Sequence, residues 1–420
     1  MRPEVPEPVP TGSRQPSLLA PVRPSQLLRH LLRAMGSPPV RFLLWDDTEI
    51  REFDGEPVGT LRIREPRVIR DILLSPDLGF GEGYVDGSLE VEGDLPRIVE
   101  AVFRAGGSPP AVVKALQALR SWHPGSNTVR RARPRAQHHY DLGNDFYRLW
   151  LDERMVYTCA YFPDAETDLE RAQEAKLEHV CRKLRLRPGE RVVEAGCGWG
   201  ALALHMARHH GVLVQAYNVS RPQVEWARQR AREAGLEDQV TFLDEDYRGV
   251  TGEYDAFVSV GMMEHVGRSH YRELGQVIRR SLRPGGRGLI HSIGRARPHP
   301  MSPWIERYIF PGSYIPSLRE MLEPLEEQDM EVLDVENLRR HYARTLELWL
   351  ERFEAVREEV ERTHDAAFVR MWRLYLAASV ASFRTGSCQL FQVLFAPAGE
   401  DSLPWTRDDI YATGAAGAPR

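Results

Sequence analysis

The run RVVEAGCGWGALALHMARHH, residues 191–210, decides the fold of this chain. It begins as an apolar, β-branched strand, passes through three alternating glycines and continues as a helix. Strand and helix then alternate through VLVQAYNVS, RPQVEWARQRAREAG, EYDAFVSVGMMEH and, after the turn RPGG, GRGLIHSIG. Strands separated by helices of this length predict an α/β fold with a parallel sheet covered on both faces. A ligand is expected at the carboxyl ends of those strands.

The glycine-rich turn is the first candidate for a cofactor site. Its glycines let the backbone leave the strand, approach a ligand closely and enter the helix. The spacing GxGxG after an acid disfavours a dinucleotide, whose pyrophosphate is held by the longer spacing GxGxxG. We therefore predict a Rossmann-like class I domain that binds S-adenosylmethionine (SAM). The cofactor candidates in the turn are Glu194, Gly196, Cys197, Gly198, Trp199 and Gly200.

Residues at the ends of the next two strands are further cofactor candidates. Acidic and amide groups at such positions can bind ribose hydroxyls or the adenine amine. Ser220, just before Arg221 and Pro222, is also a good helix N-cap, and both roles can hold together. The candidates are Asn218, Val219, Ser220, Gln223, Glu245 and Asp246.

Composition limits the class of protein. A chain of 420 residues is too long for one ordinary core, so two domains of unequal size are expected. The net charge of -5 argues against nucleic acid as the main partner. Because no run of roughly 18 apolar residues occurs, we predict a cytoplasmic protein with peripheral membrane contact. The four cysteines form no CxxC pair, which indicates neither a disulfide framework nor a structural zinc site.

Changes in composition divide the chain into five segments. They are a disordered arm (1–22), a small α+β domain associated with lipid or membrane (23–120), a basic linker (121–136), a methyltransferase domain (137–396) and a tail (397–420). Residues 25–36 predict a helix with Ser25 as N-cap and Gly36 as stop, whose leucine stripe faces either a core or an anionic membrane. The linker arginines form either a solvated connector or a docking patch for phosphate head groups: Arg130, Arg131, Arg133 and Arg135.

Eight ordered motifs extend the pattern over residues 137–396: HYDLGNDFYRLWLDERMVYTCAYF, EAGCGWG, YRGV, GMMEHVG, LIHSIG, PWIERYIFPGSYIP, YARTLELWLERF and FRTGSCQLFQVLFA. In these motifs the chain resembles the cyclopropane-fatty-acyl-phospholipid synthases and the related mycolic acid methyltransferases. The earlier segment LGFGEGYVDGSLEVEGDLPRIVEA resembles the N-terminal domain of the phospholipid-acting members. The resemblance implies a SAM-dependent enzyme acting on unsaturated phospholipid acyl chains at the membrane surface, and a homodimer.

The resemblance also implies a bound bicarbonate ion held by Cys159, Glu264, His291, the backbone of Ile293, and Tyr342, all of which this chain contains. Tyr157 and Thr158 match positions that contact the cofactor. Four aromatic residues either line an acyl channel or pack in the core: Trp304, Tyr308, Phe310 and Tyr314. The chain departs from the family at Ser379, where many members carry a cysteine, at Glu194 in place of Asp, and in the run YNVSRPQ.

The chemistry of an isolated alkene requires a strong methyl donor and a base. Alkylation gives a carbocation, and loss of a proton from the new methyl group then closes a cyclopropane in a water-poor pocket. A hydride shift before proton loss would leave a methylene branch instead. A catalytically silent lipid-binding protein is a third hypothesis, and the intact catalytic candidates speak against it. A nucleic-acid methyltransferase is disfavoured because the dense arginine cluster lies in the linker.

Overall fold

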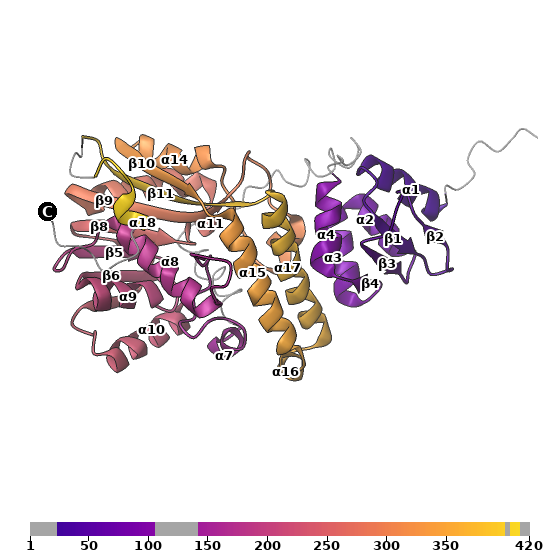
Figure 1. Ribbon diagram of the computed structural model, residues 1–420, viewed down its shortest axis with the longest axis horizontal. Helices are drawn as coiled ribbons and strands as arrows, with labels where there is room; N and C mark the ends of the chain where they lie inside the picture. The colour runs from indigo at the N-terminus through magenta and orange to yellow at the C-terminus, as the bar shows by residue number, and fades with distance from the viewer. Residues whose placement is uncertain (1–22, 106–141, 400–403, 412–420) are drawn as a thin grey trace, which may run out of the picture.

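The computed structural model describes residues 23–105, 142–399 and 404–411 (Figure 1). The predicted disordered arm and the predicted linker with its four arginines lie outside these ranges. Within them, no helix is both long enough and apolar enough to cross a membrane.

The small N-terminal domain is a four-stranded sheet packed with helices, which confirms its α+β character. Its strands pair in the order β2-β1-β3-β4, with β1 parallel to β3 and both edge strands antiparallel to their neighbours. The strands are β1 (Val40–Leu43), β2 (Glu49–Ile50), β3 (Gly59–Ile63) and β4 (Leu89–Gly93). The helices are α1 (Pro24–Ala34), α2 (Arg67–Leu74), α3 (Pro76–Asp86) and α4 (Leu95–Arg104).

Helix α1 turns its leucine stripe toward the core of this domain. Three leucines of the stripe are buried, so the membrane-facing alternative is wrong for Leu28, Leu31 and Leu32. The predicted N-cap is also wrong, because Pro24 takes the first helical position and Arg23 becomes the N-cap, which leaves Ser25 inside the helix. Gly36 follows the end of the helix with a φ of +83°, as expected of a stop.

The large domain contains a seven-stranded sheet in the order β10-β11-β9-β8-β5-β6-β7. The predicted parallel pairing is confirmed from β7 across to β9, but β11 runs antiparallel to both of its neighbours. Its direction follows from the helices before it, which return the chain to the point where β10 ends. The strands are β5 (Arg191–Ala195), β6 (Leu213–Asn218), β7 (Val240–Asp244), β8 (Tyr254–Val260), β9 (Leu282–Gly294), β10 (Met330–Asn337) and β11 (Gln389–Pro397).

The segment RPGG, predicted as a turn before the last parallel strand, lies within β9 instead. The pairing of β9 with β8 shifts register there, from Tyr254 opposite Leu282 to Ala256 opposite Arg287. Gly285 has a φ of +77° at this irregularity. The strand therefore continues through the predicted turn by means of a bulge.

Helices cover both faces of the large sheet, as predicted. On one face lie α8 (Leu169–Leu184), α9 (Ala201–His210) and α10 (Arg221–Ala234), and on the other α12 (Tyr271–Ser281) and α14 (Leu318–Glu326). Neighbouring residues of β5 point to opposite faces of the sheet. Val192 packs in the core with α8, α9 and α10, and Val193 packs in the core with α12 and α14. This alternation is the geometry of a strand buried on two sides.

A polar cluster between α8 and α9 fixes the helix that follows the glycine turn. Glu178 Oε2 accepts hydrogen bonds from His205 Nε2 at 3.2 Å and from His210 Nε2 at 3.1 Å. The Sγ atom of Cys181 lies within 4.8 Å of ligand atoms of both imidazoles. Such a grouping from two helices has no CxxC pattern and escapes a search by cysteine spacing.

The two domains are joined through α15 (Arg339–Ala355) and α17 (Ala366–Thr385), which stand between the large sheet and the small domain (Figure 1). Buried residues of the small domain and of both helices form one continuous core cluster. In α13 (Pro303–Tyr308), Trp304 packs on α3 so closely that a Cβ on Gly81 would lie 2.2 Å from its ring. Tyr308 Oη donates to Glu82 of α3 at 2.8 Å. For Trp304 and Tyr308 the structure therefore favours packing, here between domains, over an acyl channel.

Candidate active site

The glycine turn lies at the carboxyl end of β5, whose neighbours β6 and β8 are reached by crossovers in opposite directions. Such a switch point is where open α/β sheets bind ligands. Gly196, Gly198 and Gly200 have φ values of +86°, +53° and +84°. A Cβ on Gly196 would lie 2.9 Å from Met262 and one on Gly200 would lie 2.7 Å from Phe242, but one on Gly198 would meet open space. The backbone is thus accessible to a ligand at Gly198.

The end of β6 ties this turn to α10. Asn218 Nδ2 donates to the carbonyl of Gly198 at 3.1 Å and to Gln223 Oε1 at 2.8 Å. Ser220 occupies the N-cap position, as predicted, but its hydroxyl makes no capping hydrogen bond. Pro222 is one reason, because it stands at the second helical position and has no N–H to donate to Ser220.

The candidates after β7 are differently placed. Asp246 is engaged, since its Oδ1 accepts from the Arg248 backbone at 3.0 Å and its Oδ2 lies 3.0 Å from Arg248 Nη1. Glu245 is exposed, and Val219 after β6 is half-buried. Asp246 therefore stabilises the turn after β7, and a cofactor contact at Glu245 or Val219 stays a prediction.

Three buried polar atoms in this part of the described chain have no hydrogen-bond partner: Glu194 Oε2, Ser220 Oγ and Gln223 Nε2. Because buried polar groups are nearly always hydrogen-bonded, unsatisfied atoms beside an accessible turn indicate a ligand. Burial raises the pKa of Glu194 to about 8. A carboxyl, a hydroxyl and an amide fit the amine, hydroxyl and ring-nitrogen groups of SAM.

A second group of predicted residues meets where β9 faces α11 (Met263–Val266). Glu264 Oε1 accepts a hydrogen bond from the backbone of Ile293 at 2.6 Å, whereas the buried Oε2 has no partner among the described residues. Burial raises the pKa of Glu264 to about 7. His291 lies two residues before Ile293, on the same face of the strand. The structure thus joins Glu264 to the backbone of Ile293 and places His291 two residues earlier on the same strand.

The two ring nitrogens of the buried His291 side chain differ in their surroundings. Its Nδ1 lies 3.1 Å from Gln392 Nε2, and its buried Nε2 has no partner within the described ranges. Burial lowers the pKa of His291, so the ring is neutral. Because Gln392 donates to Nδ1, the proton of the ring lies on Nε2, where an anion can accept it.

Cys159 and Tyr342 come from two other elements. Cys159 is fully buried, with Sγ 4.0 Å from the carbonyl of Leu338, and the backbone of Tyr342 donates to that same carbonyl at 3.1 Å. Burial raises the pKa of the Cys159 thiol, which keeps it protonated and unreactive. The next backbone N–H, that of Ala160, donates to Thr345 Oγ1 at 3.0 Å and anchors this loop on α15.

Aromatic side chains surround the predicted cofactor loop. Tyr157 Oη lies 2.8 Å from Tyr375 Oη, and its ring centroid lies 5.4 Å from Trp150 and 5.2 Å from Trp349. Burial raises the pKa of Tyr157, so the phenol stays neutral. Phe310 packs at 5.7 Å from Tyr375 and remains a candidate for lining an acyl channel.

The site of the missing family cysteine lies in the same region. Ser379 stands on α17 one turn after Tyr375 and one turn before Phe383, whose ring centroid is 4.6 Å from that of Tyr342. Tyr314, the last channel candidate, donates to Glu320 at 2.9 Å on α14. Ser379 therefore occupies the helix face near Tyr157 and Tyr342, whereas Tyr314 is bound to a different element.

Lys176 of α8, which the sequence analysis did not single out, lies between the two groups. Its buried Nζ donates to Thr158 Oγ1 at 2.9 Å. Burial raises the pKa values of Cys159 and Glu194 and lowers that of His291, and the charge of Lys176 lowers all three. Burial in turn lowers the pKa of Lys176 to about 8. The charge of Lys176 thus affects Cys159, Glu194 and His291 together.

Gln173 supports the same loop from one turn earlier on α8. Its Nε2 donates to the carbonyl of Thr158 at 2.9 Å. A sequence signal for both residues exists, because Gln173 and Lys176 occupy positions of the buried stripe formed with Leu169, Leu177 and Val180. Polar residues on such a stripe need buried partners, and these two find them at Thr158.

This fold and this glycine turn define a class I SAM-dependent methyltransferase, as the sequence predicts. Residues 127–393 match the family described as mycolic acid cyclopropane synthetase, and residues 27–109 match a domain of unknown function. The chain therefore belongs to the mycolic acid cyclopropane synthetase family, which confirms the resemblance seen in the eight motifs.

Two relatives and one solved structure extend the comparison. The chain is 37% identical over 354 residues to the cyclopropane-fatty-acyl-phospholipid synthase of Escherichia coli K12, covering 83% of this chain and 91% of that protein. It is 35% identical over 391 residues to a probable fatty acid methyltransferase of Pseudomonas putida, covering 89% and 96%. The mycolic acid cyclopropane synthase CmaA1, complexed with SAH and CTAB, superposes with a TM-score of 0.60 at 29% identity, covering 63% and 97%.

Proposed function

We propose that this enzyme transfers a methyl group from SAM to a cis double bond of an unsaturated phospholipid acyl chain, at the membrane surface, and closes a cyclopropane. One observation carries the proposal: buried polar atoms without a hydrogen-bond partner among the described residues occur beside the glycine turn and also at Glu264 Oε2 and His291 Nε2. The similarity to the phospholipid synthase of Escherichia coli supports the choice of substrate.

The residues around Gly198 would hold the methyl donor. Polar atoms without a hydrogen-bond partner are available there from the carboxyl of Glu194, the hydroxyl of Ser220 and the amide of Gln223. Asn218 holds the turn in place through its hydrogen bond to the carbonyl of Gly198. When bound, SAM supplies an electrophilic methyl group on a positively charged sulfur. The protein positions that group and surrounds it with aromatic side chains such as Tyr157, which exclude water from the reacting carbon.

The second group would hold bicarbonate through Cys159, Glu264, His291, the backbone of Ile293, and Tyr342. When bound, this ion would supply the base. Alkylation of the ion would leave the protein unmodified, whereas alkylation of a carboxylate side chain would inactivate the enzyme. His291 can donate its Nε2 proton to an anion. Glu264, with a pKa of about 7, can take up and release a proton near neutral pH, as an acid–base residue must.

A second candidate function shares every step up to the carbocation. A hydride shift followed by proton loss would leave a methylene branch on the acyl chain. The relative in Pseudomonas putida, a probable fatty acid methyltransferase, supports this alternative. The position of the base relative to the cation decides between the two products.

The test supplies the purified enzyme with SAM carrying a labelled methyl group and with vesicles of an oleoyl phospholipid. Mass spectrometry is expected to find the label in the acyl chain, and NMR to find a ring. A methylene branch would favour the second candidate, and the absence of any alkylated lipid would refute both. The variant Glu264→Gln should keep its affinity for SAH and for vesicles and lose turnover, because an amide takes up no proton.

Bicarbonate and oligomeric state are tested separately. Turnover in buffer freed of carbon dioxide should fall and should recover on addition of bicarbonate; a rate independent of bicarbonate would refute that part of the proposal. The homodimer implied by the resemblance is checked by light scattering of the purified protein.

A further inference from the structure

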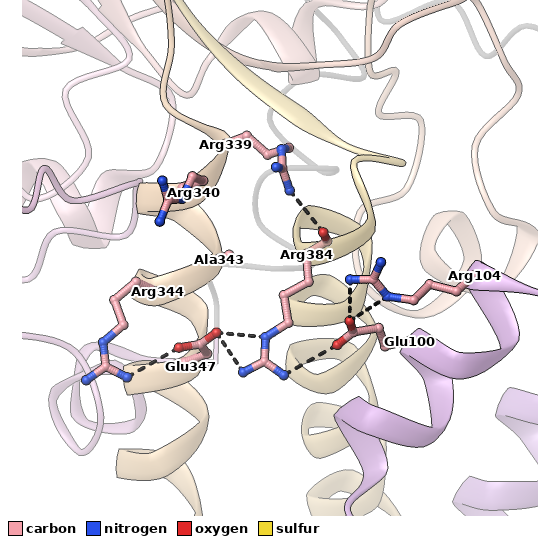
Figure 2. Close-up of a pocket in the computed structure, with 8 residues that line it drawn as sticks. All are labelled: Glu100, Arg104, Arg339, Arg340, Ala343, Arg344, Glu347 and Arg384. Carbon is pink, nitrogen blue, oxygen red and sulfur yellow. Dashed lines mark hydrogen bonds and ion pairs between the residues drawn. The ribbon is translucent and has the colours of Figure 1, made fainter. Parts of the chain in front are cut away.

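A pocket of about 420 Å³ opens at the junction of the two domains, between α4, α15 and α17 (Figure 2). Five arginines line it: Arg104 from α4, Arg339, Arg340 and Arg344 from α15, and Arg384 from α17. Against them stand two carboxylates, Glu100 and Glu347, so the lining carries an excess of three positive charges. We call these seven residues, together with Ala343, the arginine pocket.

The two carboxylates are shared among three of the arginines. Glu100 lies 2.7 Å from Arg104 and 3.5 Å from Arg384, and Glu347 lies 2.7 Å from Arg384 and 3.3 Å from Arg344. Figure 2 shows the resulting chain, with Arg384 between the two glutamates. The pair between Arg384 and Glu100 crosses the domain junction, and the four pairs together hold three of the guanidinium groups in place.

The remaining two arginines have no carboxylate partner among the described residues. Arg339 Nη1 donates to the backbone carbonyls of Phe383 and Arg384. The exposed side chain of Arg340 makes neither an ion pair nor a hydrogen bond within the described ranges. The pocket therefore offers unused donors on a rigid, positively charged frame, which is the arrangement that binds an oxyanion.

The arginine pocket lies behind the wall of the candidate active site. Tyr342 sits on α15 between Arg340 and Arg344 and is buried, whereas both arginines reach the pocket. Phe383, whose ring packs on that of Tyr342, immediately precedes Arg384 on α17. A charged group held in the pocket would thus lie one helix away from the predicted reaction centre.

We propose that the arginine pocket binds the phosphodiester head group of the phospholipid whose acyl chain is methylated. This inference rests on the proposed function. A guanidinium group matches a phosphate with two parallel hydrogen bonds, and an excess of positive charge favours anionic lipid. The location assigns a task to the small domain, because Glu100 and Arg104 of α4 complete a pocket that α15 and α17 alone would leave open.

The experiment compares Arg340→Gln with wild type on two substrates, vesicles of oleoyl phosphatidylglycerol and methyl oleate in neutral micelles. The variant should raise KM for the vesicles by about tenfold, as expected for one lost charge-assisted contact, and leave kcat and the KM for methyl oleate unchanged. The matched control is Arg319→Gln on α14, an arginine whose side chain is 89% exposed and lies outside the pocket. Equal effects of both variants would indicate general surface charge and overturn the proposal.

Binding without turnover separates this inference from the proposed function. Wild type should sediment with anionic vesicles more strongly than Arg340→Gln, even if no product forms. Titration with inorganic phosphate distinguishes a free anion from a head group: tight binding of phosphate that leaves the KM for vesicles unchanged would overturn the proposal. Unchanged sedimentation and an unchanged KM in Arg340→Gln would overturn it as well. Arg344→Gln is the second variant, and it should act in the same direction.

Discussion

Replacing Lys176 with Met is predicted to stabilise the fold while weakening cofactor binding. Burial lowers the pKa of Lys176 from 10.5 to about 8. At about 1.4 kcal/mol per pKa unit, keeping this side chain charged at neutral pH costs the fold about 3 kcal/mol. Methionine has a similar length and no charge, and it forfeits only a hydrogen bond to Thr158 worth about 1 kcal/mol. The free energy of unfolding should therefore rise by about 2 kcal/mol.

The same substitution should weaken binding of SAH. Without Lys176 the pKa of Glu194 rises further and Thr158 loses its donor, so two predicted contacts of the cofactor change together. Loss of a hydrogen bond to a charged group costs about 1.5 to 3 kcal/mol, which corresponds to a Kd about 10 to 150 times higher. Scanning calorimetry gives Tm, and isothermal titration with SAH gives Kd.

Lys183→Met is the matched control, since Lys183 is a second buried lysine of α8. Its Nζ lies 3.1 Å from Asp334 and 2.6 Å from Glu336, both on β10. Removing one partner of such a buried pair typically costs about 3 to 5 kcal/mol, and no contact with the glycine turn is involved. Lys183→Met should therefore lower Tm and leave Kd unchanged. If Lys176→Met lowered Tm in the same way and left Kd for SAH unchanged, the reasoning would be refuted.

Three further predictions concern pH, packing and capping. Burial raises the pKa of Glu264 from 4.5 to about 7, so its contribution to stability is complete below pH 4.5 and is lost as pH rises to about 7. Urea unfolding of wild type and of Glu264→Gln as a function of pH should show this loss in wild type alone, and an equal dependence on pH in both proteins would contradict it. Gly79→Ala should destabilise the small domain by about 1 to 3 kcal/mol, because the new Cβ would lie 2.3 Å from the Asp71 backbone; a Tm equal to wild type would contradict this close approach. Asp365→Ala removes the cap that accepts from the Phe368 N–H at 2.7 Å, and should cost about 1 kcal/mol by chemical unfolding, whereas Asp365→Asn should cost little.

Local patterns predicted the part of the fold that depends on neighbours in sequence. The glycine spacing from Gly196 to Gly200 predicted the turn at the end of β5, because positive φ values are a property of glycine itself. The N-cap of α1 was missed because Pro24 outweighs Ser25 at the helix start. The direction of β11 was missed because it depends on where two long helices return the chain.

The residues of the candidate site also divide into those that a local sequence pattern predicts and those that it does not. Glu194 and Asn218 follow from strand ends, whereas Cys159, Glu264, His291 and Tyr342 followed only from the family resemblance, since they come from separate elements. Lys176 was missed because its position on the buried stripe of α8 indicates only that it needs a buried partner, and does not identify that partner as Thr158. The roles of Trp304 and Tyr308 depended on contacts with α3, which no local pattern contains.

The core shared by the small domain with α15 and α17 has a consequence for biosynthesis. The ribosome completes the small domain long before α17 emerges, so the apolar faces of α3 and α4 await their partner while most of the chain is still being translated. Nascent chains with such surfaces are prone to aggregation and are protected by chaperones. Expression of the small domain by itself should for this reason give insoluble protein, and added α15–α17 sequence should restore solubility.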